Sequence, residues 1–206
     1  MAPPPVPMFP LGTVLFPYAV LPLRVFEPRY RVMTRRCLEG DREFGVVLIE
    51  RGSEVGGGDV RFDLGTIARI VQVAETPDGG YALATVGLRR FRVLRWLADD
   101  PFPQAEIDVF DEPAPAAPDF AARDRVTAAF ADVLDLWHQL DERVPRDPPP
   151  ATDNPGRDVF EIAAAAPLGP LDAQRVLEAD GTAAWSAVLH KYLGELADEL
   201  RARIAE

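Results

Sequence analysis

The stretch Pro7–Tyr30, PMFPLGTVLFPYAVLPLRVFEPRY, decides the fold of this chain. Its first charged residue is Arg24, and an apolar run of this length is typical of a membrane span or a signal peptide. The internal prolines exclude a continuous helix, because each removes a backbone donor and clashes with the preceding turn. We therefore expect neither a membrane span nor a secretory segment. We expect a cytoplasmic protein instead.

The same prolines divide the stretch into short extended pieces, because proline in a sheet is confined to edges, bulges and strand ends. We expect strands over residues 8–11 and 20–25, joined by a bend at Phe16-Pro17-Tyr18. Pro28 suits a first helical turn. Tyr30, Met33 and Cys37 then recur at helical spacing, which predicts a helix of about three turns.

The rest of the first half has the pattern of an antiparallel sheet. Turn residues at Asp78-Gly79-Gly80 separate two runs rich in β-branched residues and predict a hairpin. Gly52–Asp59 is rich in glycine but lacks the lysine and the hydroxyl residue of a phosphate-binding loop. We therefore expect a flexible tip rather than a phosphate-binding site. The strands that we expect in this half are 44–49, 66–73, 81–86, 88–96 and 105–110.

The second half reads as helical. Alternate prolines over 111–118 favour an extended spacer, which we take as the domain boundary between residues 1–110 and 119–206. Asp119 is a predicted cap for a long helix with an apolar stripe that runs to Val144. Further helices are expected at 158–166 and 172–179, and after a cap at Thr182, so that four helices pack as a small bundle.

Two blocks of sequence carry a resemblance to a known family. The order Phe9-Pro10-Leu11, Phe16-Pro17 and Leu21–Tyr30 resembles the opening of the amino-terminal domain of Lon proteases. Leu64–Ile70 and Val86–Val93 are similar to the central strands of that domain, and 166–178 is a weaker echo of its helical half. The resemblance implies an α+β fold, with a PUA-like, highly curved sheet or barrel and one helix followed by a helical bundle.

The resemblance also implies a function. Complete Lon proteases join this kind of domain to an ATPase and to a peptidase that uses a serine and a lysine. Here the only lysine is Lys191, among leucines and acids, and no nucleotide-binding loop is present. We therefore expect a non-enzymatic module whose partners are unfolded or extended polypeptide and a protease or chaperone.

The residue types that support catalysis or metal binding are sparse. His138 and His190 lie on predicted long helices beside apolar stripe residues, where a surface or flanking role is expected. Two histidines and one cysteine, widely spaced, give no zinc pattern. We expect no catalytic residue, no metal and no cofactor, and an inert, packed thiol at Cys37.

Four aromatic residues sit beside prolines in predicted bends, where loops carry exposed side chains. These candidate polypeptide-binding residues are Phe16, Tyr18, Phe26 and Phe102. The alternative is that they fold back and plug the ends of the sheet.

An arginine-rich strand leaves RNA or nucleotide binding open as a second function. Strand periodicity places Phe91 and Val93 on one face and Arg90 and Arg92 on the other, either as a solvated face or as a phosphate-binding patch. The charge argues against nucleic acid, since the chain beyond residue 110 has 9 basic and 19 acidic residues. The candidate phosphate-binding residues are Arg89, Arg90, Arg92 and Arg95.

Overall fold

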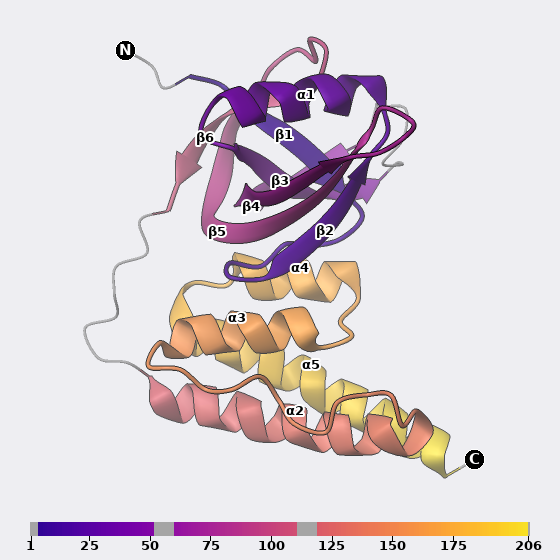
Figure 1. Ribbon diagram of the computed structural model, residues 1–206. Helices are drawn as coiled ribbons and strands as arrows, with labels where there is room; N and C mark the ends of the chain where they lie inside the picture. Colours follow the sequence, from indigo (N-terminus) through magenta and orange to yellow (C-terminus); the bar gives the residue numbers. More distant parts are fainter. Residues whose placement is uncertain (1–3, 52–59, 111–118, 206) are drawn as a thin grey trace. The chain divides into compact units, whose positions relative to one another are not determined.

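The computed structural model describes residues 4–51, 60–110 and 119–205 (Figure 1). The chain forms two compact units, Met1–Asp111 and Glu112–Glu206, which we call the β unit and the helical unit. The predicted spacer at 111–118 and the glycine-rich tip at 52–59 lie outside the described residues. None of the helices in the described ranges combines the length and the hydropathy that a membrane crossing requires.

The β unit is a curved sheet of six strands with one helix; the curved sheet and the helix are as predicted, whereas the sequence predicted seven strands. Its strands lie in the order β2-β5-β4-β3-β1-β6, and β5 also pairs with β6. The elements are β1 Val6–Leu11, β2 Val20–Val25, α1 Pro28–Glu39, β3 Glu43–Arg51, β4 Val60–Glu75, β5 Tyr81–Trp96 and β6 Gln104–Val109.

Strand β5 closes the sheet. Its first part, Tyr81–Val86, pairs with β2, and its last part, Phe91–Trp96, pairs with β6, while β4 runs along its other edge. The sequence predicted two strands here. The two predicted strands form one continuous strand, because the chain continues beyond Gly87 through a β-bulge. In this bulge Leu88 and Arg89 both lie opposite a single β4 residue. Strand β2 is thereby left at the edge of the sheet.

Two other features of the sheet depart from the pattern expected from sequence. The pair β1–β3 is parallel rather than antiparallel. The connection between these strands contains β2 and α1, and a connection of that length can return the chain in the same direction. Strand β4 is also longer than the predicted 66–73, and a second bulge lies between Ile70 and Gln72.

Helix α1 covers one part of the sheet, as Figure 1 shows. It begins with Pro28 in the first turn and buries Tyr30, Met33 and Cys37, as predicted. The ring of Tyr30 stacks on Phe9 of β1 at a centroid distance of 4.2 Å. Burial raises the pKa of the Cys37 thiol to about 11, so the thiol stays protonated and unreactive near neutral pH.

The centre of the curved sheet is filled by Phe91, whose side chain is fully buried. The strands that surround it carry glycine where the ring lies. A Cβ atom on Gly45 would come within 2.8 Å of the ring tip, and one on Gly65 within 3.0 Å of it and within 2.1 Å of the Val46 carbonyl oxygen. The sheet therefore bends tightly around Phe91 only because these two positions have no side chain.

The helical unit consists of four helices in the described part of the chain, as expected. Asp119 caps α2 by accepting a hydrogen bond from Ala122 N–H, as predicted. The predicted cap at Thr182 is wrong, because α5 begins at Gly181 and its N-cap position is Asp180. The helices are α2 Phe120–Leu140, α3 Pro155–Ala165, α4 Pro170–Glu178 and α5 Gly181–Ile204.

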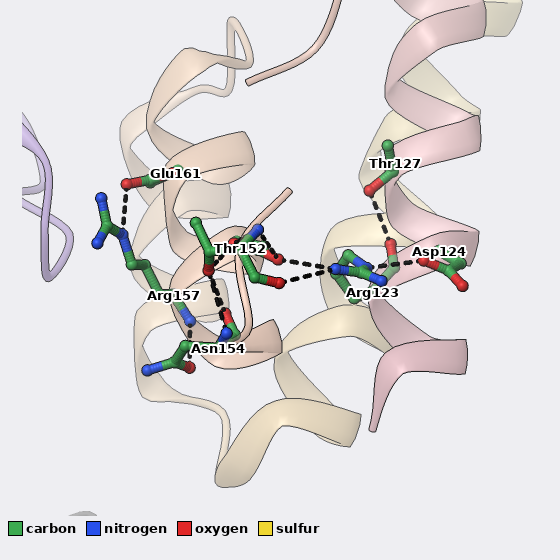
Figure 2. Close-up of polar contacts among 8 residues, drawn as sticks. Arg123, Asp124, Thr127, Thr152, Asn154, Arg157 and Glu161 are labelled. Atoms are coloured by element: carbon green, nitrogen blue, oxygen red, sulfur yellow. Dashed lines mark hydrogen bonds and ion pairs between the residues drawn. The ribbon is translucent and has the colours of Figure 1, made fainter. Parts of the chain in front are cut away.

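Between α2 and α3 the chain runs back along α2 as an irregular segment, residues 141–154, which we call the strap (Figure 1). A polar cluster ties the end of the strap to the start of α2 (Figure 2). The buried Asp158 carboxylate accepts hydrogen bonds from the N–H and hydroxyl of Thr152 and pairs with Arg123 at 3.1 Å. Arg123 also donates to the Thr152 carbonyl oxygen at 3.2 Å. These contacts fix where the strap ends.

Replacing Gly65 by alanine tests the role of the glycines around Phe91. The new Cβ would meet the Val46 carbonyl, which is backbone and cannot turn away. We expect Gly65→Ala to lower the free energy of unfolding by at least about 2 kcal/mol. Gly194→Ala is the control, since its Cβ meets nothing within 4 Å, and it should raise stability by up to about 1 kcal/mol. Urea denaturation followed by circular dichroism measures both, and equal midpoints would contradict the packing argument.

Replacing Asp158 by asparagine tests the polar cluster. The variant leaves Arg123, whose side chain is 14% exposed, without its buried partner, while the exposed Asp124 remains beside it. We expect Asp158→Asn to destabilise the helical unit by about 2 to 3 kcal/mol. Asp153→Asn, an exposed change in the strap, should stay within about 0.5 kcal/mol of the parent. The measurement is urea unfolding followed by tryptophan fluorescence, and a wild-type midpoint for Asp158→Asn would show that the cluster adds no stability.

Candidate functional site

The structure divides the four candidate aromatic residues into two pairs. Tyr18 is 43% exposed and Phe26 is 50% exposed, so both can meet a partner. Phe16 and Phe102 are 3% and 1% exposed, so the expectation that they lie at the surface is wrong. Phe102 belongs to the core cluster beneath α1. The backbone of the bend at Phe16 and Pro17 packs directly on Gly87.

The bend at Tyr18 is held by strand β5. The Tyr18 N–H donates to the Gly87 carbonyl oxygen at 2.7 Å, and the Gly87 N–H donates to the Ala19 carbonyl oxygen at 2.9 Å. A Cβ atom on Gly87 would lie 2.1 Å from the Phe16 carbonyl oxygen, so this contact requires glycine. Tyr18 has a φ of 67°, a backbone conformation that is costly for a non-glycine residue. The exposed tyrosine is therefore fixed in place by its surroundings.

Alternate residues along the edge strand are exposed. From Tyr18 to Phe26 every second side chain faces solvent, and four of these five side chains are apolar. A solvent-facing row in an antiparallel sheet is ordinarily polar. We call this row the edge strip; its members are Tyr18, Val20, Pro22, Arg24 and Phe26. At about 3.3 Å per residue the strip is at most about 26 Å long, because Tyr18 lies in the bend before the strand.

A small pocket lies at the Phe26 end of the edge strip. Its volume is about 160 Å³, which is smaller than the roughly 300–1,000 Å³ typical of small-molecule sites. Leu23 and Tyr30 line it with Phe26, and Glu27 contributes a carboxylate that pairs with Arg29 at 3.2 Å. The size suits a single side chain rather than a cofactor.

Proline within the edge strand limits how a partner can bind. Pro22 pairs with Ala84 of β5, and a proline inside a strand lies where its missing N–H faces the unpaired edge. The edge therefore lacks one donor in the middle of its row. A polypeptide laid along β2 would be held by side chains of the edge strip more than by a continuous ladder of backbone hydrogen bonds.

The four candidate phosphate-binding arginines do not form one open patch. Phe91 and Val93 are buried together, as predicted, and Arg92 is exposed. Arg90 is not on a solvated face: it is 4% exposed, and its Cζ atom lies 5.3 Å from the centroid of the Phe110 ring. The Arg95 guanidinium pairs with Glu106 of β6, which raises the pKa of Arg95 and lowers that of Glu106. Arg89 is exposed at the bulge.

The residues that a hydrolase would need are apart. His138 contacts the Val144 carbonyl oxygen through Nδ1 at 2.9 Å, which is a structural contact with the strap, and His190 is exposed on α5. Lys191 is exposed and pairs with Glu195 at 3.6 Å, whereas Ser186 of the same helix is buried. Within the described residues, no group of three side chains is arranged to hold a metal ion.

Sequence reasoning missed Val20 and Pro22 as members of the site, because every residue from Tyr18 to Phe26 except Arg24 is apolar. The sequence therefore shows no polar–apolar alternation that would separate the exposed row from the covered one, and the alternation is seen only in the burial of these residues. Only the topology shows that β2 is an edge strand and that its outer row has no covering element in the β unit.

Comparisons with known proteins give a consistent family. The family model described as the substrate-binding domain of ATP-dependent protease La (LON) matches residues 5–193. Lon protease 2 of Myxococcus xanthus is 29% identical over 181 residues, which are 84% of this chain and 21% of that protein. Lon protease 2 of Sorangium cellulosum is 29% identical over 208 residues, which are 96% of this chain and 25% of that protein. The chain thus spans a quarter or less of the length of these relatives.

Two solved structures have the same fold. A Lon N-terminal domain protein from Xanthomonas campestris superposes with a TM-score of 0.66 at 27% identity, and the match covers 93% of this chain and 98% of that one. The N-terminal domain of a Mycobacterium avium complex Lon protease gives a TM-score of 0.61 at 19% identity, over 95% and 99% of the two chains, and shows the fold alone. The curved sheet, the helical unit and the family match together show that this chain belongs to the family of Lon protease substrate-binding domains.

Proposed function

We propose that this chain is a non-catalytic module that binds unfolded or extended polypeptide along the edge strip. The observation that carries the proposal is the row of apolar side chains that the edge strand turns toward solvent. Val20 is 67% exposed, more than either aromatic residue of the strip. The family description, a substrate-binding domain of a protease, supports the same function.

The physical basis is the burial of apolar surface. Aromatic side chains provide large contact areas and are frequent among the residues that dominate binding energy. Tyr18 and Phe26 stand at opposite ends of the strip, so two apolar side chains of one extended segment can be covered together. Tyr18 keeps a strained backbone although a glycine would remove the strain, and such outliers concentrate at functional sites.

The partner chemistry follows from the same row. Side-chain contacts that are mainly apolar select segments rich in apolar residues, and folded proteins bury such segments in their cores. We therefore expect unfolded proteins to bind and folded proteins to be ignored. A protease or chaperone that receives the bound polypeptide, and a cytoplasmic location, stay predictions.

Truncation of the two aromatic residues tests the proposal. We expect the double variant Tyr18→Ala and Phe26→Ala to weaken binding of a permanently unfolded protein, such as reduced and carboxymethylated α-lactalbumin, by at least about 30-fold. Isothermal titration calorimetry measures the affinity.

The matched control for this test is Leu94→Ala. Leu94 is 66% exposed on β5 of the same unit but lies outside the edge strip, so its truncation should leave affinity unchanged. Native α-lactalbumin should not bind. Equal affinities for the parent and the double variant, or no binding at high micromolar concentration, would remove the proposal.

A non-catalytic role predicts that the chain does not cleave a protein substrate. Lys191 and Ser186 differ in exposure on one helix, and the sequence contains no phosphate-binding loop with a lysine. Incubation of the chain with casein should leave casein intact on a gel, with or without ATP. Cleavage that disappears in Lys191→Ala would overturn this part of the proposal.

Nucleic-acid binding is not proposed as a second function. The buried position of Arg90 and the pairing of Arg95 with Glu106 weaken the pattern that motivated it.

A further inference from the structure

The helical unit contains a second apolar site, a pocket of about 730 Å³ between helix α2 and the strap. Phe130 and Leu134 are buried and form its floor, and Trp137 is partly exposed at its side. The strap contributes the opposite wall through Val144 and Pro148–Pro150. The volume lies in the range of sites that take up a ligand rather than in that of packing defects.

The pocket is held open by anchors at both ends of the strap. At the near end, His138 Nδ1 contacts the Val144 carbonyl oxygen at 2.9 Å. At the far end, the Thr152 N–H and hydroxyl donate hydrogen bonds to the Asp158 carboxylate at 3.0 and 2.6 Å. Between the anchors, three consecutive prolines restrict the backbone to extended conformations. The strap therefore cannot collapse onto α2, and the pocket is preformed.

The rim of the pocket is negative. Arg143 donates to both carboxylate oxygens of Asp141, at 2.9 and 2.8 Å, so these two charges cancel. Asp147 also lines the pocket and has no ion pair with a described residue. Arg146 precedes it in the chain but is not part of the pocket lining. Residues 112–206 carry 18 acidic and 9 basic residues, so the surrounding field has the same sign.

We propose that this pocket binds an apolar side chain of an extended polypeptide that has a basic residue close beside it. The apolar side chain enters between Trp137 and the proline wall, and the basic group meets Asp147 at the rim. This inference rests on the proposed polypeptide-binding function and deepens it, because it adds a second contact site with its own preference for positively charged segments. An acidic flank would place like charge beside Asp147 and is disfavoured.

Filling the pocket is the first test. Ala165, the exposed last residue of α3, lines the pocket, and Ala164 beside it is also exposed but does not line it. We expect Ala165→Phe to weaken binding of a decapeptide with a Leu-Phe centre and lysine flanks at least about ten-fold. Ala164→Phe should bind like the parent. Isothermal titration calorimetry on the full chain gives the affinities, and thermal melting by circular dichroism shows that both variants are folded.

Changing the charge is the second test. Three decapeptides share the Leu-Phe centre and carry lysine, glutamine or glutamate flanks. We expect affinity to fall in that order, by about two- to five-fold per step. Asp147→Asn should remove the advantage of the lysine peptide over the glutamine peptide, whereas Asp153→Asn, in the same strap but outside the pocket lining, should keep it. Equal affinity for all three peptides, or a preference for glutamate flanks, would overturn the proposed charge preference.

The outcomes separate this inference from the proposed function. Binding of an unfolded protein that depends on Tyr18 and Phe26 but is the same in Ala165→Phe and Ala164→Phe overturns the pocket and leaves the edge strip standing. Loss of peptide binding in Ala165→Phe alone supports the pocket. If the parent binds neither peptide nor unfolded protein, the proposed function and this inference both fail.

Discussion

The packing of Phe91 against bare backbone is the constraint on which the β unit depends. Phe91 is one of several buried side chains inside the curved sheet, and its ring fits only because the facing strands leave room for it at Gly45 and Gly65. Closure takes the last part of β5 to β6 and leaves its first part free to hold β2. The edge strip thus depends on the core, because the pairing of β5 with β6 closes the sheet and leaves β2 at its edge.

In the helical unit, a buried charged group holds a segment that has no regular secondary structure. Its strap has no regular secondary structure, yet it borders a cavity and must keep a fixed path. A buried carboxylate with several donors provides this path, because an unpaired Asp158 would be far costlier than a paired one. In both units an exposed or irregular segment is held by a buried residue of a neighbouring element, Gly87 for the bend at Tyr18 and Asp158 for the strap.

Much of this arrangement could be predicted from sequence, and the failures have physical causes. Helix α1, the hairpin turn and the cap at Asp119 follow from local rules, and they agree with the structure. Local rules gave Phe16 and Tyr18 the same environment, although one is buried and the other exposed, because burial in a bend depends on the strand that packs against it. The pocket was missed for a similar reason. Trp137 belongs to the predicted apolar stripe, and only the path of the strap shows that its side chain borders a cavity.

Pro22 limits the tendency of β2 to pair with strands of other chains. An unpaired edge strand is an aggregation hazard, since it can pair with strands of other chains and start cross-β growth. The missing N–H in the middle of β2 interrupts any such pairing, while the side chains on either side stay available. On the proposed function, we expect β2 to bind an extended polypeptide through its side chains without adding that polypeptide to the sheet as a further strand.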